Sequence, residues 1–291
     1  MLHKIREHFD ENFCSKVQED LSLSSKKWDL DSLELIDSFS SNCVFTGHSC
    51  QYGDIVLKVG KPCKEMDTEI NSLVEYNGGH FCKIYDFDRN RGIILEEWIK
   101  PGIRLRKEAF LEKRLQVFSD LYHGLHIPSK NPELYPTYLD WVSRITQYMS
   151  ERRDYEELYG YMRKARDLCK QIYEKYNATM LLHGDLHQDN ILLDAKGEYK
   201  IIDPKGVIGD PVFEVSRFIL NEFEEGSTLQ YNYDKISAII NNLEDRLRIP
   251  REILGQCFFI ETTMANCWNV EDDMSPNLQM VKMAEHIWKG V

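Results

Sequence analysis

Apolar residues in the first hundred positions fall into short runs that are typical of strands. Separated by Ser, Asn and Gly, these runs predict strands over 33–39, 43–48, 54–60, 81–87 and 92–99. Segment 64–76 differs, because Met66, Ile70 and Leu73 recur there at helical spacing. The predicted order is therefore three strands, one helix and two strands, the last two joined by the turn DRNRG.

After the Pro-Gly step in 100–104 the pattern changes to helical periodicity. It predicts helices over 106–125, 138–150, 153–176, 232–247 and 250–269. The exception is 191–203, which predicts two short strands around an Ala-Lys-Gly turn. We therefore expect an α+β protein with a small antiparallel-sheet lobe containing one helix, residues 1–99, and a larger helical lobe, residues 100–291.

Composition narrows the class of protein. The chain has 291 residues, of which 42% are hydrophobic and 29% charged, as in ordinary globular proteins. A formal net charge of −12 argues against a general nucleic-acid or membrane-surface binder and is compatible with a cationic substrate. The eight cysteines form no C-x-x-C pair, and we expect free thiols. With no apolar h-region at the start and no membrane-length apolar run, we expect a cytoplasmic location.

A polar cluster interrupts two apolar runs in LLHGDLHQDNILLD, residues 181–194. Burying so many polar groups without partners would be costly, so we expect them to line a cleft and to serve a ligand. If 191–193 and 199–202 pair as a hairpin, Asp203 returns to face Asn190, with Asp185 nearby. Two carboxylates and an amide oxygen suit magnesium, which commonly takes one or two carboxylates together with substrate phosphates.

A lysine stands in an apolar strand upstream. Lys58 lies among Ile55, Val56, Leu57 and Val59 and, if it points inward, needs an anionic partner. Glu69, beside the apolar stripe of the next predicted helix, can supply it. A lysine held by a helix glutamate, followed by D-x-x-x-x-N and a later Asp, is the set of residues used in kinase-type phosphoryl transfer.

These motifs carry a family resemblance. The strings HGDLHQDNILLD and IIDPKGVIGDPVFEVSRF resemble the aminoglycoside phosphotransferase family, relatives of the eukaryotic protein kinases. Together with KKWDL (26–30) and NCWNVED (266–272), IDPKGVIGDP resembles the streptomycin 6-kinase and hydroxyurea phosphotransferase branch. The resemblance runs from about Trp28 to Asp272. It implies a two-lobed protein-kinase-like fold and an ATP- and magnesium-dependent O-phosphotransferase acting on a small-molecule hydroxyl.

The resemblance also implies roles for single residues. Asp185 would accept the proton of the substrate hydroxyl, and His183 would brace the catalytic loop. Asn190 and Asp203 would hold magnesium, and Lys58, fixed by Glu69, would bind the α- and β-phosphates. Nucleotide contacts would also come from the main chain of Glu96 and Trp98 at the adenine and of Ser40, Ser41 and Asn42 at the phosphates.

The chain departs from its relatives in places. Pro204-Lys205 follows the metal aspartate where protein kinases have Phe-Gly, and Lys205 is a candidate for the γ-phosphate or for a structural ion pair. Glu214 stands where the family more often has Asp, and we read this change and the nearby Asp210 as structural. Candidates for holding amines or guanidines of a cationic acceptor are Glu261, Glu271 and Asp272.

Other functions remain open from the sequence. His183, Asp185 and a distant His match the H-x-D…H triad of iron oxygenases, but the second half is helical and those sites usually occur in strand-rich barrels. A pseudokinase would bind nucleotide without transferring phosphate. A protein kinase would need more room than the seven positions from Asp203 to Asp210. The acceptor is left open between an aminoglycoside-type antibiotic such as streptomycin and a metabolite, a sugar or an amino alcohol.

Overall fold

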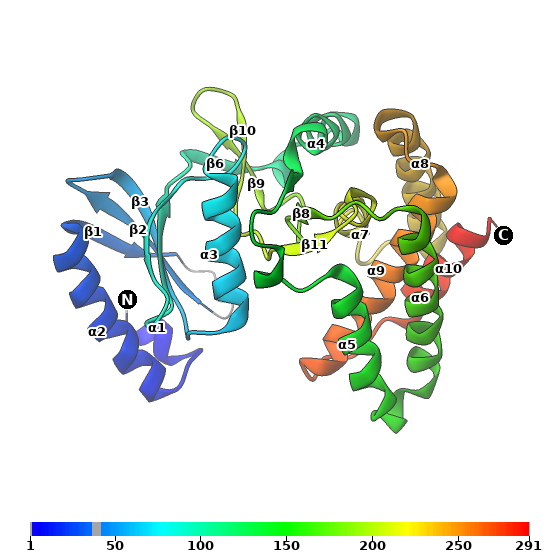
Figure 1. Cartoon of the computed structure of the whole chain (residues 1–291), viewed down its shortest axis with the longest axis horizontal. Coiled ribbons are helices and arrows are strands. Elements are labelled where there is room, and N and C mark those ends of the chain that lie inside the picture. The colour runs from blue at the N-terminus through cyan, green and yellow to red at the C-terminus, as the bar shows by residue number, and fades with distance from the viewer. Residues whose placement is uncertain (1, 37–41, 291) are drawn as a thin grey trace. The chain divides into compact units, whose positions relative to one another are not determined.

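The structure is a computed structural model that describes residues 2–36 and 42–290, and its chain forms two compact units (Figure 1). The first unit consists of Met1–Ile103 together with Leu192–Lys205. The second consists of Arg104–Ile191 together with Gly206–Val291. The fold is α+β, with an antiparallel sheet in the first unit and mostly helices in the second, as the sequence predicted.

The first unit is built on an antiparallel five-stranded sheet of order β1-β2-β3-β5-β4. Its strands are β1 (Leu30–Leu35), β2 (Cys43–Ser49), β3 (Gly53–Val59), β4 (Ile84–Asp88) and β5 (Ile93–Glu97). Alternation along β3 sends Ile55, Leu57 and Val59 to one face and Lys58 to the other, because successive side chains of a strand point to opposite faces. The pairing Lys58↔Ile94 fixes the register with β5.

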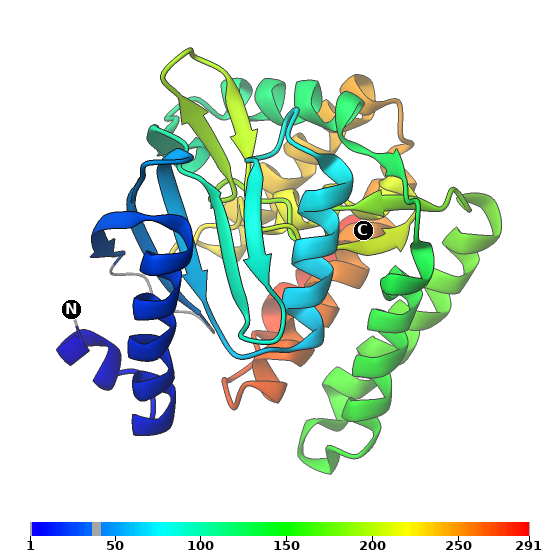
Figure 2. The same ribbon diagram turned by 60° about the vertical axis from the view of Figure 1, so that its left-hand side comes forward.

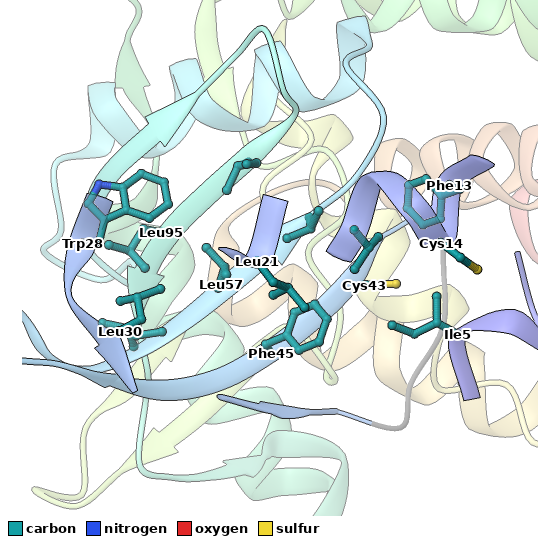
Figure 3. Packing of buried hydrophobic residues seen from close by; sticks show 14 residues of the cluster. Ile5, Phe13, Cys14, Leu21, Trp28, Leu30, Cys43, Phe45, Leu57 and Leu95 are labelled. Carbon is teal, nitrogen blue, oxygen red and sulfur yellow. The ribbon is translucent and has the colours of Figure 1, made fainter. Parts of the chain in front are cut away.

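Two N-terminal helices, α1 (Leu2–Arg6) and α2 (Glu11–Trp28), were not predicted from the sequence. Phe13, Val17 and Leu21 repeat at four-residue spacing along α2 and form one core with Phe45 and Leu57 of the sheet (Figure 3). The predicted strand over 33–39 is β1, which begins earlier and ends at Leu35. Residues 37–41 lie outside the part of the chain that the structure describes.

The other face of the sheet carries α3 (Lys64–Tyr76), whose bounds match the predicted helix (Figure 2). The predicted hairpin at 191–203 is formed by β9 (Ile191–Asp194) and β10 (Tyr199–Ile201), and β6 (Pro101–Arg104) pairs with β9. A bridge between Phe81 and Ile201 joins this hairpin to the segment after α3, which brings Asp203 into the first unit.

The second unit is mainly helical, with helices α4 (Leu111–Leu125), α5 (Tyr138–Ser150), α6 (Glu156–Lys175), α7 (Val215–Leu220), α8 (Leu229–Leu247), α9 (Arg251–Glu271) and α10 (Leu278–Lys289). A small antiparallel sheet of order β11-β8-β7 contains β7 (Ile127–Pro128), β8 (Met180–Leu182) and β11 (Val207–Gly209). Helix α9 packs against α5, α6, α7, α8 and α10 and is the centre of this core. Among the described residues, no helix is long and apolar enough to cross a membrane.

Candidate active site

Lys58 is the centre of a polar cluster in the first unit. Its Nζ lies 2.7 Å from Glu69 Oε1 on α3 and 3.1 Å from Glu96 Oε1 on β5, and it also contacts Asp203 Oδ1. The lysine is only 5% exposed. Three residues that the sequence proposed for one site, Lys58, Glu69 and Asp203, therefore lie together. The Glu96 side chain is an addition, because only its main chain was expected to take part.

This cluster has more negative than positive charge. Burial by itself lowers the pKa of Lys58, but Asp203, Glu69 and Glu96 outweigh that effect and hold its pKa well above the usual value. Burial raises the pKa of Glu96 to about 7, despite the opposing attraction of Lys58. One ammonium group facing three carboxylates leaves a net negative site, which favours a further cation.

Asp203 occupies a strained position at the exit of β10. Its φ of 59° lies in the left-handed region, which costs energy for a residue other than glycine and is common at functional sites. Its side chain is 44% exposed, so the carboxylate is accessible as well as bound to Lys58. Lys205, two residues later, is exposed and lies 3.5 Å from Glu65 on α3, the ion pair that the sequence offered as one alternative.

Glu96 and Trp98, whose main-chain groups were predicted to contact the adenine, lie on β5 and just after it. Glu96 is paired with Val56 in the sheet, and the N–H of Trp98 donates a long hydrogen bond of 3.4 Å to Asp54 O. Trp98 also lines a pocket of about 470 Å³ in the first unit. Lys58 does not line this pocket, so the pocket and the Lys58 cluster are separate features.

The predicted phosphate loop is described only in part. Ser40 and Ser41 lie outside the described residues. The Asn42 side chain packs against Gly60, where an added Cβ would lie 2.0 Å from Asn42 Oδ1. Asn42 and Gly60 thus belong to the same end of the β2–β3 pair.

The loop after β8 contains the proposed catalytic aspartate and is held by Glu214. The Glu214 carboxylate accepts hydrogen bonds from the main-chain N–H groups of His183 (2.6 Å) and Gly184 (3.0 Å). His183 is fully buried, and its Nδ1 accepts from the Asp185 N–H at 3.0 Å. Gly184 has a φ of 79°, and a Cβ there would lie 2.7 Å from Trp141. These contacts hold the loop in place, and Nδ1 of His183 is not available to an iron ion.

A second histidine of this loop, His187, likewise accepts a hydrogen bond from the main-chain N–H two residues later. His187 Nδ1 accepts from the Asp189 N–H at 3.2 Å, so the proton of the neutral ring is on Nε2. That Nε2 lies 3.8 Å from Asp185 Oδ1. Burial lowers the pKa of His187, which favours the neutral ring and an N–H directed at the aspartate.

Asn190 is fixed so that its amide oxygen can face a ligand. Its Nδ2 donates to the Asp185 carbonyl oxygen at 3.0 Å, which leaves Oδ1 as the acceptor. No group of three or more His, Cys, Asp or Glu side chains that could hold a metal occurs within residues 2–36 and 42–290. Taken separately, the Asp203 carboxylate in the first unit and the Asn190 amide oxygen in the second are ligand types that suit magnesium, which usually takes few protein ligands and completes its shell with phosphates and water.

Two of the three acidic residues expected to hold a cationic acceptor are already paired inside the second unit. Glu261 is 3% exposed and accepts a hydrogen bond from the Tyr138 hydroxyl at 2.7 Å. Both oxygens of Glu271 accept from Arg144, at 2.6 and 2.9 Å. Asp272 is exposed at the end of α9.

Arg217 on α7 is a residue of this region that the sequence analysis did not single out. Its Nε lies 2.9 Å from Asp185 Oδ1 and 3.3 Å from Glu261 Oε1, and its guanidinium lies 5.3 Å from the centre of the Trp268 ring. The available signal was its position three residues after Glu214 in EVSRF, within the quoted motif. Glu214, at the N-cap of α7, and Arg217, within α7, thus contact the same loop.

The fold is protein-kinase-like. Structures of similar fold include the choline kinase LicA from Streptococcus pneumoniae, with a TM-score of 0.65, 16% identity and coverage of 94% of this chain and 97% of that one. A thermostable mutant of aminoglycoside phosphotransferase APH(4)-Ia, in a ternary complex with ADP and hygromycin B, gives a TM-score of 0.61 at 12% identity, with 92% and 97% coverage.

Sequence comparison identifies the family. Residues 27–273 match the family model described as aminoglycoside/hydroxyurea antibiotic resistance kinase, and the chain belongs to this family. It is thus a small-molecule kinase, and the resemblance inferred from its motifs is confirmed.

Two curated relatives are similar over different lengths. Streptomycin 6-kinase from Streptomyces griseus is 22% identical over 230 residues, 75% of this chain and 72% of that protein. Hydroxyurea phosphotransferase from Kitasatospora aureofaciens is 34% identical over 93 residues, 32% of this chain. That match spans only about a quarter of the relative's length, 25%.

Proposed function

We propose that this protein transfers the γ-phosphoryl group of ATP, with magnesium, to a hydroxyl group of a small molecule. The observation that carries the proposal is the environment of Lys58. A buried lysine that faces three carboxylates is a poor device for stability, since desolvating charged groups costs more than a pair returns. It suits a site that binds a phosphate-bearing ligand together with a metal ion.

Nucleotide binding is assigned to the first unit. Lys58, oriented by Glu69, binds the α- and β-phosphates, and the main chain of Glu96 and Trp98 meets the adenine. The main chain over Ser40, Ser41 and Asn42 contributes to phosphate binding. Asn190 and Asp203 would hold magnesium, which when bound supplies positive charge that offsets the charge developing on the phosphates.

The acceptor reaction is assigned to the loop after β8. Asp185 accepts a hydrogen bond from the acceptor hydroxyl and orients its oxygen toward the γ-phosphorus. The bond from γ-phosphorus to the bridging oxygen of ADP breaks, the bond to the acceptor oxygen forms, and Asp185 takes the proton. Glu214 and His183 hold Asp185 in place through the loop main chain. The transition state is largely dissociative, so positioning is the main contribution of these residues.

The setting we propose is the cytoplasm, with no nucleic-acid or membrane partner. All eight cysteines are free, as is usual in a reducing compartment, and the net charge of −12 disfavours polyanionic partners. Acceptors named for the relatives, streptomycin and hydroxyurea, are the first candidates, followed by metabolites such as sugars and amino alcohols.

An ADP-release assay tests the proposal. Purified protein with ATP and magnesium is offered streptomycin, hydroxyurea, methylthioribose, choline and homoserine, and phosphorus NMR identifies any phosphorylated product. We expect acceptor-dependent ADP release that chelation of magnesium by EDTA abolishes. Magnesium-dependent ATP binding without transfer to any acceptor would instead indicate a pseudokinase, and no nucleotide binding at all would refute the proposal.

A further inference from the structure

The side chain of Arg217 is fixed beside the proposed catalytic aspartate. Its Nε lies 2.9 Å from Asp185 Oδ1 and 3.3 Å from Glu261 Oε1, and the side chain is only 20% exposed. Its guanidinium lies over the Trp268 ring, which in turn makes an edge-to-face contact with Trp141. Moving Arg217 away would leave the nearly buried Glu261 without its cation. The guanidinium is therefore held in place beside Asp185 and Glu261.

Its hydrogen-bonding capacity is not used within the protein. The Nε is buried and, despite its short distance to Asp185, makes no well-aligned hydrogen bond. In the described part of the chain, both ion pairs of Arg217 are made through Nε, and neither terminal nitrogen donates a hydrogen bond. A guanidinium carries five N–H donors in a planar fork, so several donors remain for a ligand.

Two of the acidic residues expected to hold a cationic acceptor, Glu261 and Glu271, are already paired within the protein. Glu261 accepts a hydrogen bond from the Tyr138 hydroxyl and forms an ion pair with Arg217. Glu271 is bound by both terminal nitrogens of Arg144. Glu261 and Glu271 are therefore occupied, and the N–H donors of Arg217 are the ligand-binding groups that remain beside Asp185.

The Asp185 carboxylate, a hydrogen-bond acceptor, thus lies next to the charged N–H donors of Arg217. We propose that Arg217 is a specificity-determining residue whose terminal N–H groups bind a carboxylate of the acceptor, beside the hydroxyl that Asp185 receives. Hydroxy acids are then the preferred acceptor class, because guanidinium and carboxylate groups pair through two parallel charged hydrogen bonds. This inference rests on the proposed phosphotransferase function and narrows it.

The test compares acceptors that differ mainly in the carboxylate. The kcat/KM for ATP-dependent phosphorylation is measured for glycolate against ethylene glycol, for L-serine against ethanolamine, and for the polycation streptomycin. Loss of a charged hydrogen bond corresponds to roughly 10- to 100-fold, so we expect the wild type to prefer each acid by about that factor. Arg217→Gln should remove the preference by slowing only the acids, and Arg217→Lys should restore part of it.

A matched control is Arg166→Gln on α6, where the guanidinium pairs with its neighbour Asp167 and which should keep the wild-type ratios. Circular dichroism and thermal unfolding show whether each variant is folded. Faster transfer to ethanolamine or streptomycin than to the acids, in the wild type, would overturn the inference without touching the proposed activity.

Binding distinguishes the two proposals if no acceptor is phosphorylated. Saturation-transfer NMR then measures the binding of glycolate and L-serine to wild type and Arg217→Gln in the presence of magnesium and a non-hydrolysable ATP analogue. If the acids bind to the wild type but not to Arg217→Gln, this result would support the role of Arg217 and count against the proposed transfer. Absence of binding, or equal binding to both proteins, would overturn the inference.

Discussion

Replacing Glu96 with glutamine should stabilise the protein at alkaline pH. Glu96 is 3% exposed, and burial raises the pKa of its carboxyl group to about 7, above a usual value near 4.5. The unfolded chain releases this proton above about pH 4.5, whereas the folded chain keeps it until about pH 7. The folded state thus binds more protons in this window, and its free energy of unfolding falls as pH rises through it.

The size of the effect follows from the same two values. A difference between about 7 and 4.5, at 1.36 kcal/mol per pH unit, corresponds to at most roughly 3 kcal/mol. Glutamine resembles the protonated carboxyl group, so Glu96→Gln should match the wild type near pH 4.5 and gain up to that amount at pH 8. Lys58 keeps two carboxylates, Glu69 and Asp203, so the substitution does not leave it unpaired.

Thermal unfolding between pH 5 and 8 is a suitable assay, because 1 kcal/mol corresponds to roughly 2–4 °C in a chain of this size. The difference in Tm between Glu96→Gln and wild type should grow steadily with pH. The matched control is Glu97→Gln, at the next position on β5, which should show no such trend. A Glu96→Gln protein less stable than wild type at pH 8 would refute the reasoning and show that the Lys58–Glu96 attraction exceeds the cost of burial.

Two further predictions concern the loop after β8. Asp185→Asn should leave ATP binding nearly intact while lowering kcat by orders of magnitude, since it removes the proton acceptor but not the nucleotide contacts; unchanged turnover would exclude Asp185 as the base. Glu214→Ala should lower stability by roughly 2–4 kcal/mol, because the buried N–H of His183 and the partly buried N–H of Gly184 lose their acceptor, with partial rescue in Glu214→Gln. Chemical denaturation of the three proteins would measure this, and a loss below about 0.5 kcal/mol would contradict the assigned contacts.

The sequence was most informative where one pattern had one structural meaning. The apolar run 54–60 contains Lys58, which would need an anionic partner if it pointed inward, and the helical stripe of 64–76 offered Glu69, the partner that the structure shows. The Ala-Lys-Gly turn predicted the hairpin that returns the chain to Asp203. These are local patterns, so a single sequence was enough to recover them.

Features that depend on tertiary contacts were missed. The apolar stripe of α2 is diluted by polar residues, and its burial becomes evident only against the sheet. Glu96 was expected to contribute only main-chain groups, because a glutamate side chain in a strand is normally solvated. Arg217 lies within a quoted motif, but its contacts with Asp185 and Glu261 join parts of the chain that sequence spacing does not connect.

The central proposal is that Asp203 and Asn190 bind the same magnesium–nucleotide complex. Calorimetric titration of a non-hydrolysable ATP analogue, with magnesium and with EDTA, tests it in Asp203→Ala, Asn190→Ala and the double variant, with the exposed Asp31→Ala as control. We expect each single variant to lose most of the magnesium-dependent affinity and the double variant to lose little more, the mark of coupled residues. Normal magnesium-dependent binding in Asp203→Ala, or losses that simply add, would contradict the account.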